Sequence, residues 1–424
     1  MTLYRSAASA LLLVAVSACS PKTEATTPPP VTAPAVEAPA EPEVVCNYLV
    51  LIDAGSSGSR ALTYQITAAE GGAAPTIAQR GDAKVEPGLA SFKEDPAKAA
   101  ASIEELLKKD GSALATLPAA CHAKTPVALM ATAGMRLLEG EAGGEAAALR
   151  IYDAVSAQVK SAGLDLRFAG TISGSQEAVY GWLSANYALG RLAGEQTVGS
   201  LDLGGASAQI AFAAGEAGAG TTAVKVGDKS FNVYAQSYLG YGQDVAREYL
   251  AVDACYNKGL RKGTGKYAAC AKTLTAVVKP KSCEASGCGL AAPNNDKKPG
   301  VAQPAIPAGM KFYAVSNFYW ARNFYGLPED ATLAQLREAA GGPKGSAGFC
   351  ATPWKTATEQ RQDTPEKFLE GYCFAAGWID ALLTTMGFAA DSQQLVWTNN
   401  FGEAEAGWAL GAALCSVTGC LSAK

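Results

Sequence analysis

Two separate segments of this chain share one order of features: a buried strand, an aspartate, a glycine-rich turn and a second strand. In the first segment, the apolar run ends at Asp53 and the turn leads into strand-like alternation over 60–67. In the second, the run ends at Asp202 and the turn leads into a strand over 208–213. A repeated unit of this kind predicts two related α/β lobes that face each other.

The body of the chain, from Cys46 to Lys424, is long enough for two such lobes. Hydrophobic residues make up 49% of the sequence, so large cores are possible. Residues 263–307 are rich in Gly, Lys, Pro and Cys and are expected to form a disulfide-braced surface insertion. Apolar runs and helical spacing predict strands at 125–132 and 166–172, and helices at 96–109, 145–162, 176–187, 367–386 and from 408 onward.

The N-terminus has the order of an export signal. Arg5 supplies a positive start, residues 7–16 are apolar, and small residues precede Cys19. The apolar run is too short to span a membrane, which takes about 20 residues. Because the residues before Cys19 resemble a bacterial lipoprotein cleavage box, residues 1–19 are expected to be a lipoprotein signal peptide that leaves a lipidated Cys19. Plain secretion with cleavage near Cys19 is the alternative.

Residues 20–45 consist mainly of Pro, Ala, Thr, Glu and Val without periodicity. Such a stretch cannot bury enough apolar surface to form a core, so we expect a disordered linker. It would act as an extended tether that holds the body away from the membrane surface, at the periplasmic face or the cell surface. The net charge of -4 argues against a partner of the nucleic-acid class. The sequence leaves the oligomeric state open.

The chain has 11 cysteines, and setting Cys19 aside for the lipid leaves an even number. In an exported body these are expected to form disulfides, although spacing alone does not fix the pairing. A zinc site lacks support, because no C-x-x-C pair occurs and His122 is the one histidine. The nearest pairings are Cys283–Cys288, Cys415–Cys420, Cys255–Cys270 and Cys350–Cys373, which leave Cys46–Cys121.

The single histidine also excludes most Ser-His-Asp and Cys-His mechanisms, so catalysis must rest on carboxylates, hydroxyls, backbone amides and metal. Glycine-rich turns bring N–H groups to phosphate oxygens. Asp53 and Asp202, at the mouths of the turns, can hold a hydrated divalent cation. Glu177, just past a Ser-Gly-Ser turn, can take a proton from water. Taken alone, each feature is more often an ordinary turn or a residue that caps a strand or helix. Together they provide all the groups that a phosphohydrolase site requires.

Four motifs occur in order along the body: Asp53-Ala-Gly-Ser-Ser-Gly-Ser-Arg60, Ala131-Thr-Ala-Gly-Met-Arg136, Ile172-Ser-Gly-Ser-Gln-Glu-Ala-Val-Tyr-Gly-Trp182 and Asp202-Leu-Gly-Gly-Ala-Ser-Ala-Gln209. They resemble the signature regions of the apyrase family, which comprises the nucleoside triphosphate diphosphohydrolases and Golgi nucleoside diphosphatases. Shorter landmarks, such as 237–242 and 408–411, extend the resemblance over most of the body.

The resemblance implies an α/β fold of two actin-like, ribonuclease-H-like lobes, with mixed sheets flanked by helices and a nucleotide cleft between them. Lobe I would comprise 46–172 and about 400–424, and lobe II 173–399. The implied reaction removes the terminal phosphate from nucleoside triphosphates and diphosphates, down to the monophosphate. Water would attack directly and in line, without a phosphoenzyme, in the presence of Mg²⁺ or Ca²⁺.

The resemblance also assigns roles to single residues. Glu177 matches the base that activates water, and Asp53 and Asp202 match the carboxylates that hold the water shell of the metal. The other matched residues are Ser207, Gln209 and Thr132 around the attacking water, Ser56, Ser57 and Gly58 in the first phosphate loop, and Gly204, Gly205 and Ala206 in the second.

Substrate preference is less defined. Gly58 stands where many animal cell-surface members carry histidine, which brings the chain closer to the diphosphatase branch. Gln243 stands where some relatives have arginine. Tyr319 and Tyr372 are candidates for stacking on the base, and core packing is an equal alternative for both.

Two other functions fit parts of the pattern. An exopolyphosphatase of the actin-like superfamily would share both turns and the glutamate, but not ordinarily the 131–136 segment or so many cysteines. A surface lipoprotein that binds nucleotide without turnover would usually have lost its charged site residues, and Glu177 and both aspartates are present. The sequence therefore favours an exported, lipid-anchored nucleotide hydrolase.

Overall fold

The computed structural model describes residues 44–69, 71, 73–194, 196–283, 287–343 and 346–421. The predicted signal peptide, Cys19 and all of the predicted linker before Val44 lie outside these ranges. Within the described ranges, no helix is both long enough and apolar enough to cross a membrane.

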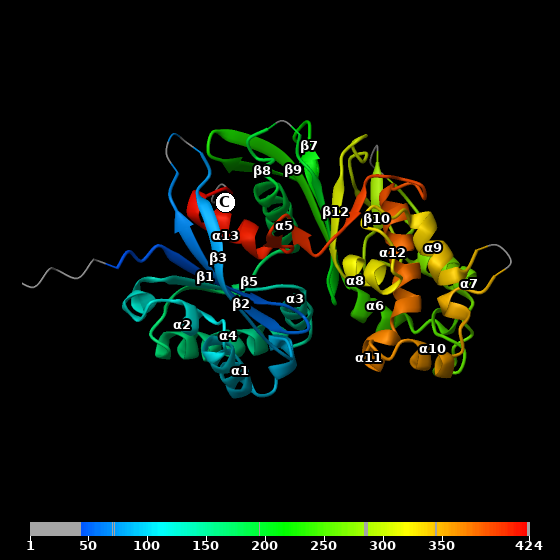
Figure 1. The fold of residues 1–424 in the computed structure, drawn as a ribbon, viewed down its shortest axis with the longest axis horizontal. Helices are drawn as coiled ribbons and strands as arrows, with labels where there is room; N and C mark the ends of the chain where they lie inside the picture. Colours follow the sequence, from blue (N-terminus) through cyan, green and yellow to red (C-terminus); the bar gives the residue numbers. More distant parts are fainter. Residues whose placement is uncertain are drawn as a thin grey trace, which may run out of the picture. The chain divides into compact units, whose positions relative to one another are not determined.

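The first sheet consists of β1 (Tyr48–Ala54), β2 (Ser59–Thr67), β3 (Thr76–Val85), β4 (Pro126–Ala131) and β5 (Asp165–Thr171). Its strand order is β3-β2-β1-β4-β5. β1 is antiparallel to β2 and parallel to β4, so the sheet is mixed (Figure 1). The β1–β2 hairpin is the predicted first unit, and Asp53 lies at the end of β1, opposite Arg60.

The first sheet is covered by α1 (Pro96–Lys108), α3 (Ala133–Glu139), α4 (Gly144–Ser161), α5 (Gly174–Ala188) and α13 (Ala409–Thr418). Side chains alternate along β1, as the pleat of a strand requires. Val50 and Ile52 pack with residues of α1 and α4. Leu49 and Leu51 pack on the other face with residues of α5 and α13. Helices on both faces make β1 a buried central strand, which explains its continuous apolar run.

The second sheet consists of β6 (Gly199–Leu203), β7 (Ser207–Ala214), β8 (Thr221–Val226), β9 (Lys229–Leu239), β12 (Phe312–Ser316) and β13 (Leu395–Trp397). Its strand order is β13-β12-β6-β7-β9-β8. β6 is antiparallel to β7 and parallel to β12, which repeats the surroundings of β1. The predicted duplication of a hairpin in two mixed sheets is confirmed.

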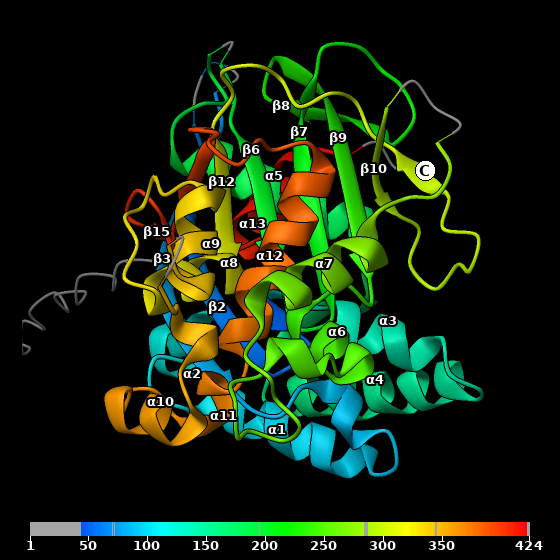
Figure 2. The same cartoon turned by 90° about the vertical axis from the view of Figure 1, so that its right-hand side faces the viewer.

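The helices of the second half are α6 (Gln243–Leu250), α7 (Tyr267–Val278), α8 (Asn317–Phe324), α9 (Leu333–Gly341), α10 (Trp354–Gln360), α11 (Glu366–Leu369) and α12 (Tyr372–Met386). α12 is the central one and shares a core with the second sheet, α7 and α9 (Figure 2). The single helix predicted at 367–386 is divided into α11 and α12, with Gly371 between them. The short elements are α2 (Ala113–Thr116), β10 (Cys288–Ala291), β11 (Gly300–Ala302), β14 (Asn400–Phe401) and β15 (Ala404–Glu405).

α5 and α13 connect the two sheets. Their side chains form one apolar cluster with residues of β1 and β2 and with residues of β7 and β9. The two helices approach so closely that a Cβ on Gly411 would lie 2.0 Å from the Tyr180 carbonyl oxygen. Because both helices contact both sheets, the predicted boundary between lobe I (46–172 with about 400–424) and lobe II (173–399) stays a prediction.

The segment 263–307 is more than the surface insertion that its composition predicts. Cys270, Leu274 and Val278 recur every four residues on α7 and are fully buried in the core around α12. Leu290 of β10 joins the same core. The apolar residues are spaced widely among Gly, Lys and Pro, so composition alone conceals the buried face of the helix.

The predicted disulfide pairing is confirmed, and no cysteine from Cys46 to Cys420 is left over. The bridges are Cys46–Cys121, Cys255–Cys270, Cys283–Cys288, Cys350–Cys373 and Cys415–Cys420.

Candidate active site

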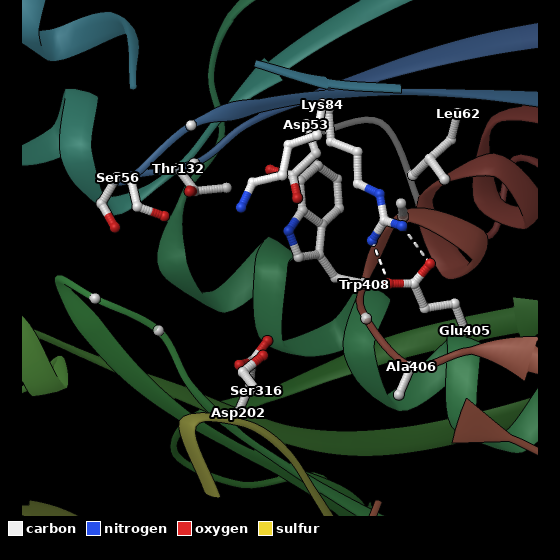
Figure 3. Close-up of a pocket in the computed structure, with 18 of the residues that line it drawn as sticks. Asp53, Ser56, Leu62, Lys84, Thr132, Asp202, Ser316, Glu405, Ala406 and Trp408 are labelled. Atoms are coloured by element: carbon white, nitrogen blue, oxygen red, sulfur yellow. Dashed lines mark hydrogen bonds and ion pairs between the residues drawn. The ribbon is translucent and has the colours of Figure 1, made fainter. Parts of the chain in front are cut away.

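A cavity of about 560 Å³ is lined by residues of both glycine-rich turns, 55–58 and 204–207 (Figure 3). The structure thus brings together residues that are far apart in the sequence. The predicted site residues in its lining are Asp53, Ser56, Ser57, Gly58, Thr132, Glu177, Asp202, Gly204, Gly205, Ala206, Ser207 and Tyr319.

The two turns have the same internal hydrogen bond. Gly55 N donates to Gly58 O at 2.9 Å, and Gly204 N donates to Ser207 O at 3.0 Å. The turns also lie close to each other, because a Cβ on Gly205 would be 2.8 Å from Ser56 Oγ. Glycine-rich turns that line one cavity suit an anion-binding site.

Each turn packs closely against a glycine at the start of a helix. A Cβ on Gly134, at the start of α3, would lie 2.9 Å from Ser56 Cα. A Cβ on Gly242, which precedes α6, would lie 2.2 Å from Ala206 N. Asp244 N and Val245 N of α6 both donate to Gly205 O at 3.0 Å. Larger residues at Gly134 or Gly242 would therefore displace the turns.

Five carboxyl groups line the cavity, and three of them belong to the predicted site: Asp53, Glu177 and Asp202. Burial, with smaller contributions from the charges of Glu177 and Asp202, raises the pKa of Asp53 to about 8. Burial also raises the pKa of Asp202, and a hydrogen bond from Ser316 opposes that shift. Asp53 Oδ1 is buried without a hydrogen-bond partner among the described residues.

Glu177 lies in the first turn of α5, which begins with a capping box between Ser173 and Gln176. Its side chain is 9% exposed. Gln209 Nε2 donates to Glu177 Oε2 at 3.1 Å and lies 2.6 Å from Ser207 Oγ. Gln209 is not part of the cavity lining, but its amide connects two residues that are.

Arg136 also belongs to the site. It ends one of the four sequence motifs, but the sequence did not predict a role for it. Its Nη2 donates to Glu177 Oε2, and its side chain is 13% exposed. Burial raises the pKa of Glu177 to about 7, although the positive charge of Arg136 lowers it. In the sequence, Arg136 is the one charged residue of the stretch 131–136, and this feature could have indicated its role in the site.

Ser316 is a second residue that the sequence did not single out. It ends β12, next to Asp202 of β6, and its hydroxyl donates to the Asp202 carboxylate. Figure 3 shows the two side chains together. Ser316 has φ 59°, a left-handed value that is costly for a residue other than glycine. Only the tertiary arrangement reveals this strained, cavity-lining position.

The two predicted base-stacking residues have different positions. Tyr319 of α8 lines the cavity, with the Arg322 guanidinium 5.2 Å from its ring centroid. Tyr372 is not part of the lining. Its ring is stacked on Phe324 with a centroid distance of 3.8 Å, because the start of α12 packs against the end of α8. The structure does not bring Tyr372 into this cavity.

The far end of the cavity is lined by Leu62 and Tyr64 of β2, Trp408 and the pair Arg60 and Glu405. Arg60 donates to Glu405 and, through Nε at 2.7 Å, to Asp82. These contacts connect β2 and β3 with the β14–β15 hairpin. Among the described residues, no group of three or more His, Cys, Asp or Glu side chains is arranged to hold a metal ion directly.

Two mixed sheets that face one cavity through equivalent glycine-rich turns define a two-lobed, actin-like fold. A structure titled as nucleoside triphosphate hydrolases from Neospora caninum shares this fold, with a TM-score of 0.60, 16% identity and coverage of 87% of this chain and 92% of that chain. The chain belongs to the GDA1/CD39 (nucleoside phosphatase) family, whose profile matches residues 41–258 and 247–422.

Two relatives match most of this chain. "Probable apyrase 6" of Arabidopsis thaliana is 29% identical over 424 residues, which cover 86% of this chain and 71% of that protein. "Ectonucleoside triphosphate diphosphohydrolase 8" of Bos taurus is 29% identical over 427 residues, which cover 86% and 81%. The chain is accordingly a nucleoside phosphatase of the apyrase kind.

Proposed function

We propose that this enzyme removes the terminal phosphate from nucleoside triphosphates and diphosphates, with Glu177 as the base for an attacking water. The observation that carries the proposal is the position of Glu177: it is buried at the cavity that both glycine-rich turns line, with a pKa of about 7. A carboxyl group with this pKa is matched to proton transfer near neutral pH.

The surrounding groups have complementary roles in this proposal. The N–H groups of both turns bind and orient the phosphate chain, and they stabilise the charge that spreads over the transferred phosphoryl group. Gln209 and Ser207 hold the water beside Glu177, and Thr132 lines the same space. Water attacks in line, and Glu177 accepts its proton.

A divalent cation fits the same site. Asp53 Oδ1 is buried and unpaired, and three carboxyl groups repel one another, so a positive charge is needed there. Oxygen groups suit Mg²⁺ or Ca²⁺, and a hydrated cation would be held through its water shell by the two aspartates. Asp53 and Asp202 would hold the ion, with Ser316 orienting Asp202. When bound, the ion supplies charge neutralisation on the phosphate oxygens.

We assign the enzyme to the cell envelope, outside the cytosol. The support is the export signal of residues 1–19, the lipoprotein-like residues around Cys19 and the disulfides of the body. Mass spectrometry of the N-terminal peptide tests the lipid: a diacylated Cys19 supports the anchor, and a free N-terminus near Cys19 indicates plain secretion.

The reaction is tested by phosphate release from ATP, ADP, GDP, UDP and polyphosphate, with Mg²⁺, Ca²⁺ or EDTA, using the disulfide-bonded body. Metal-dependent release from nucleotides supports the proposal and ranks the substrates. Release from polyphosphate alone would replace it with an exopolyphosphatase. A folded protein that binds nucleotide and releases no phosphate would be a binding protein on an enzyme scaffold.

Replacing Arg136 with Gln is expected to lower kcat about 10- to 100-fold, as for other residues that orient a reactive group. The Arg136 charge lowers the pKa of Glu177, so its loss raises that pKa and leaves less ionised base. The acidic limb of the pH–rate profile should therefore move to higher pH. Arg136→Lys, which keeps the charge, should restore most of the original profile; an unshifted profile in Arg136→Gln would contradict this role.

A further inference from the structure

Arg60 and Lys84 are the basic residues among the described side chains that line the cavity. They lie opposite each other on the antiparallel strands β2 and β3, so their side chains leave the sheet on the same face. Arg60 is committed to two acidic partners, Asp82 and Glu405. Lys84 has one acidic partner, Glu86, at 2.9 Å, and both of these side chains are 56% exposed.

The end of β3 passes directly over the first glycine-rich turn. A Cβ on Gly58 would lie 2.5 Å from Val85 O and 3.4 Å from Lys84 Cε. The ammonium group is one bond beyond that carbon, and Figure 3 shows the side chain extending into the cavity. The backbone of Lys84 is held by the pairing with Arg60 and by Lys109 Nζ, which donates to Lys84 O at 2.8 Å.

We propose that Lys84 is a substrate-binding residue whose ammonium contacts the phosphate chain of the nucleotide on the first turn. The inference rests on the proposed nucleotide hydrolysis and adds a side-chain cation to turns that otherwise offer backbone amides and hydroxyls. When substrate binds, Lys84 exchanges Glu86 for phosphate oxygens.

Charge and exposure favour this exchange. An exposed Lys–Glu pair contributes at most about 1 kcal/mol, so little is lost when it opens. A polyphosphate offers several negative charges, and ammonium-to-phosphate hydrogen bonds are among the stronger ones. A side-chain cation beside the first turn therefore has a clear electrostatic use once Glu86 is exchanged for phosphate.

A structural role for Lys84 would consist in its ion pair with Glu86, which would help to hold the end of β3. The two roles make opposite predictions for Glu86. If the pair is structural, Glu86→Gln and Lys84→Met impair the enzyme in the same direction. If Lys84 binds phosphate, Glu86 competes with substrate, and Glu86→Gln improves substrate binding while Lys84→Met weakens it.

The experiment measures kcat and KM for ATP and ADP at saturating metal for wild type, Lys84→Met, Lys84→Arg and Glu86→Gln. Lys84→Met keeps the apolar stem over Gly58 and is expected to raise KM about tenfold with kcat nearly unchanged, the pattern of lost ground-state binding. Lys84→Arg should stay near wild type, and Glu86→Gln should lower KM about two- to threefold, because a competing charge is gone.

Lys98→Met is the matched control, because Lys98 forms an exposed pair with Asp95 outside the cavity. It should leave both constants unchanged. Thermal unfolding of every variant separates stability from binding. Unchanged KM in Lys84→Met, or a raised KM in Glu86→Gln, would overturn the role of Lys84 in an active enzyme. Wild-type protein without metal-dependent nucleotide hydrolysis would instead overturn the proposed function itself.

Discussion

Glu177→Gln is expected to lower the rate of phosphate release about 10³-fold or more while nucleotide binding persists. Removal of a general base typically costs about 10²–10⁴-fold, and here the chain has no histidine near the site to replace it. Glutamine has nearly the same shape and can still accept the hydrogen bond from Arg136. It cannot accept a proton from water near neutral pH, so the loss should fall on kcat.

The measurement is initial phosphate release from ATP with metal, paired with calorimetric titration of a non-hydrolysable ATP analogue. Glu139→Gln is a suitable control, because Glu139 is a half-buried glutamate that accepts a hydrogen bond from Thr171 Oγ1 and does not line the cavity. It should retain activity. Near-normal turnover by folded Glu177→Gln would remove the glutamate from the proposed role.

Asp53→Asn is expected to lower metal-dependent activity at least about a hundredfold and, in EDTA, to raise the midpoint of thermal unfolding by about 2–4 °C. The two effects have one cause. Without a cation, the Asp53 carboxylate is buried, unpaired at Oδ1 and close to Glu177 and Asp202. Burial, more than repulsion from Glu177 and Asp202, raises the pKa of Asp53 to about 8, so near neutral pH the folded state must take up a proton or keep a buried charge. Asparagine removes that cost and also removes a carboxylate that would hold the water shell of the proposed metal.

Unfolding curves of wild type and Asp53→Asn, each with EDTA and with saturating Mg²⁺, test both parts. Wild type should gain stability from the metal by mass action, and the variant should gain much less. Asp380→Asn is a control for which the midpoint of thermal unfolding should change in the opposite direction, because Asp380 is also buried but is paired with Arg337. It should lower the midpoint. A destabilised Asp53→Asn in EDTA would contradict the picture of uncompensated carboxylates.

The sequence predicts the structure correctly where one local pattern determines one local structure. The runs before Asp53 and Asp202 became central strands, and the glycine-rich turns became hairpins with the same internal hydrogen bond. Apolar runs of this kind suit a central strand covered on both faces. The nearest-neighbour pairing of the cysteines, which spacing suggests without fixing it, agrees with the bridges because most of them join cysteines that are near one another in the sequence.

Predictions were weaker where two elements distant in sequence decide the environment of a side chain. Base stacking and core packing were equal alternatives for Tyr372, and its ring packs on Phe324 at the junction of α8 and α12. α7 was expected at the surface, but α12 buries one of its faces. Composition and local spacing describe a residue's own segment and leave its tertiary neighbours undetermined.

The sequence by itself determined the two strand–aspartate–turn units, the candidate base Glu177 and the chemistry available to the site, since these depend on residue type and local order. Only the tertiary structure decided that Arg136 meets Glu177, that Ser316 is strained beside Asp202, and that Lys84 lies over Gly58. These contacts join different strands and helices. Their energies depend on distance and burial, which are fixed only when the two sheets and the helices between them pack together.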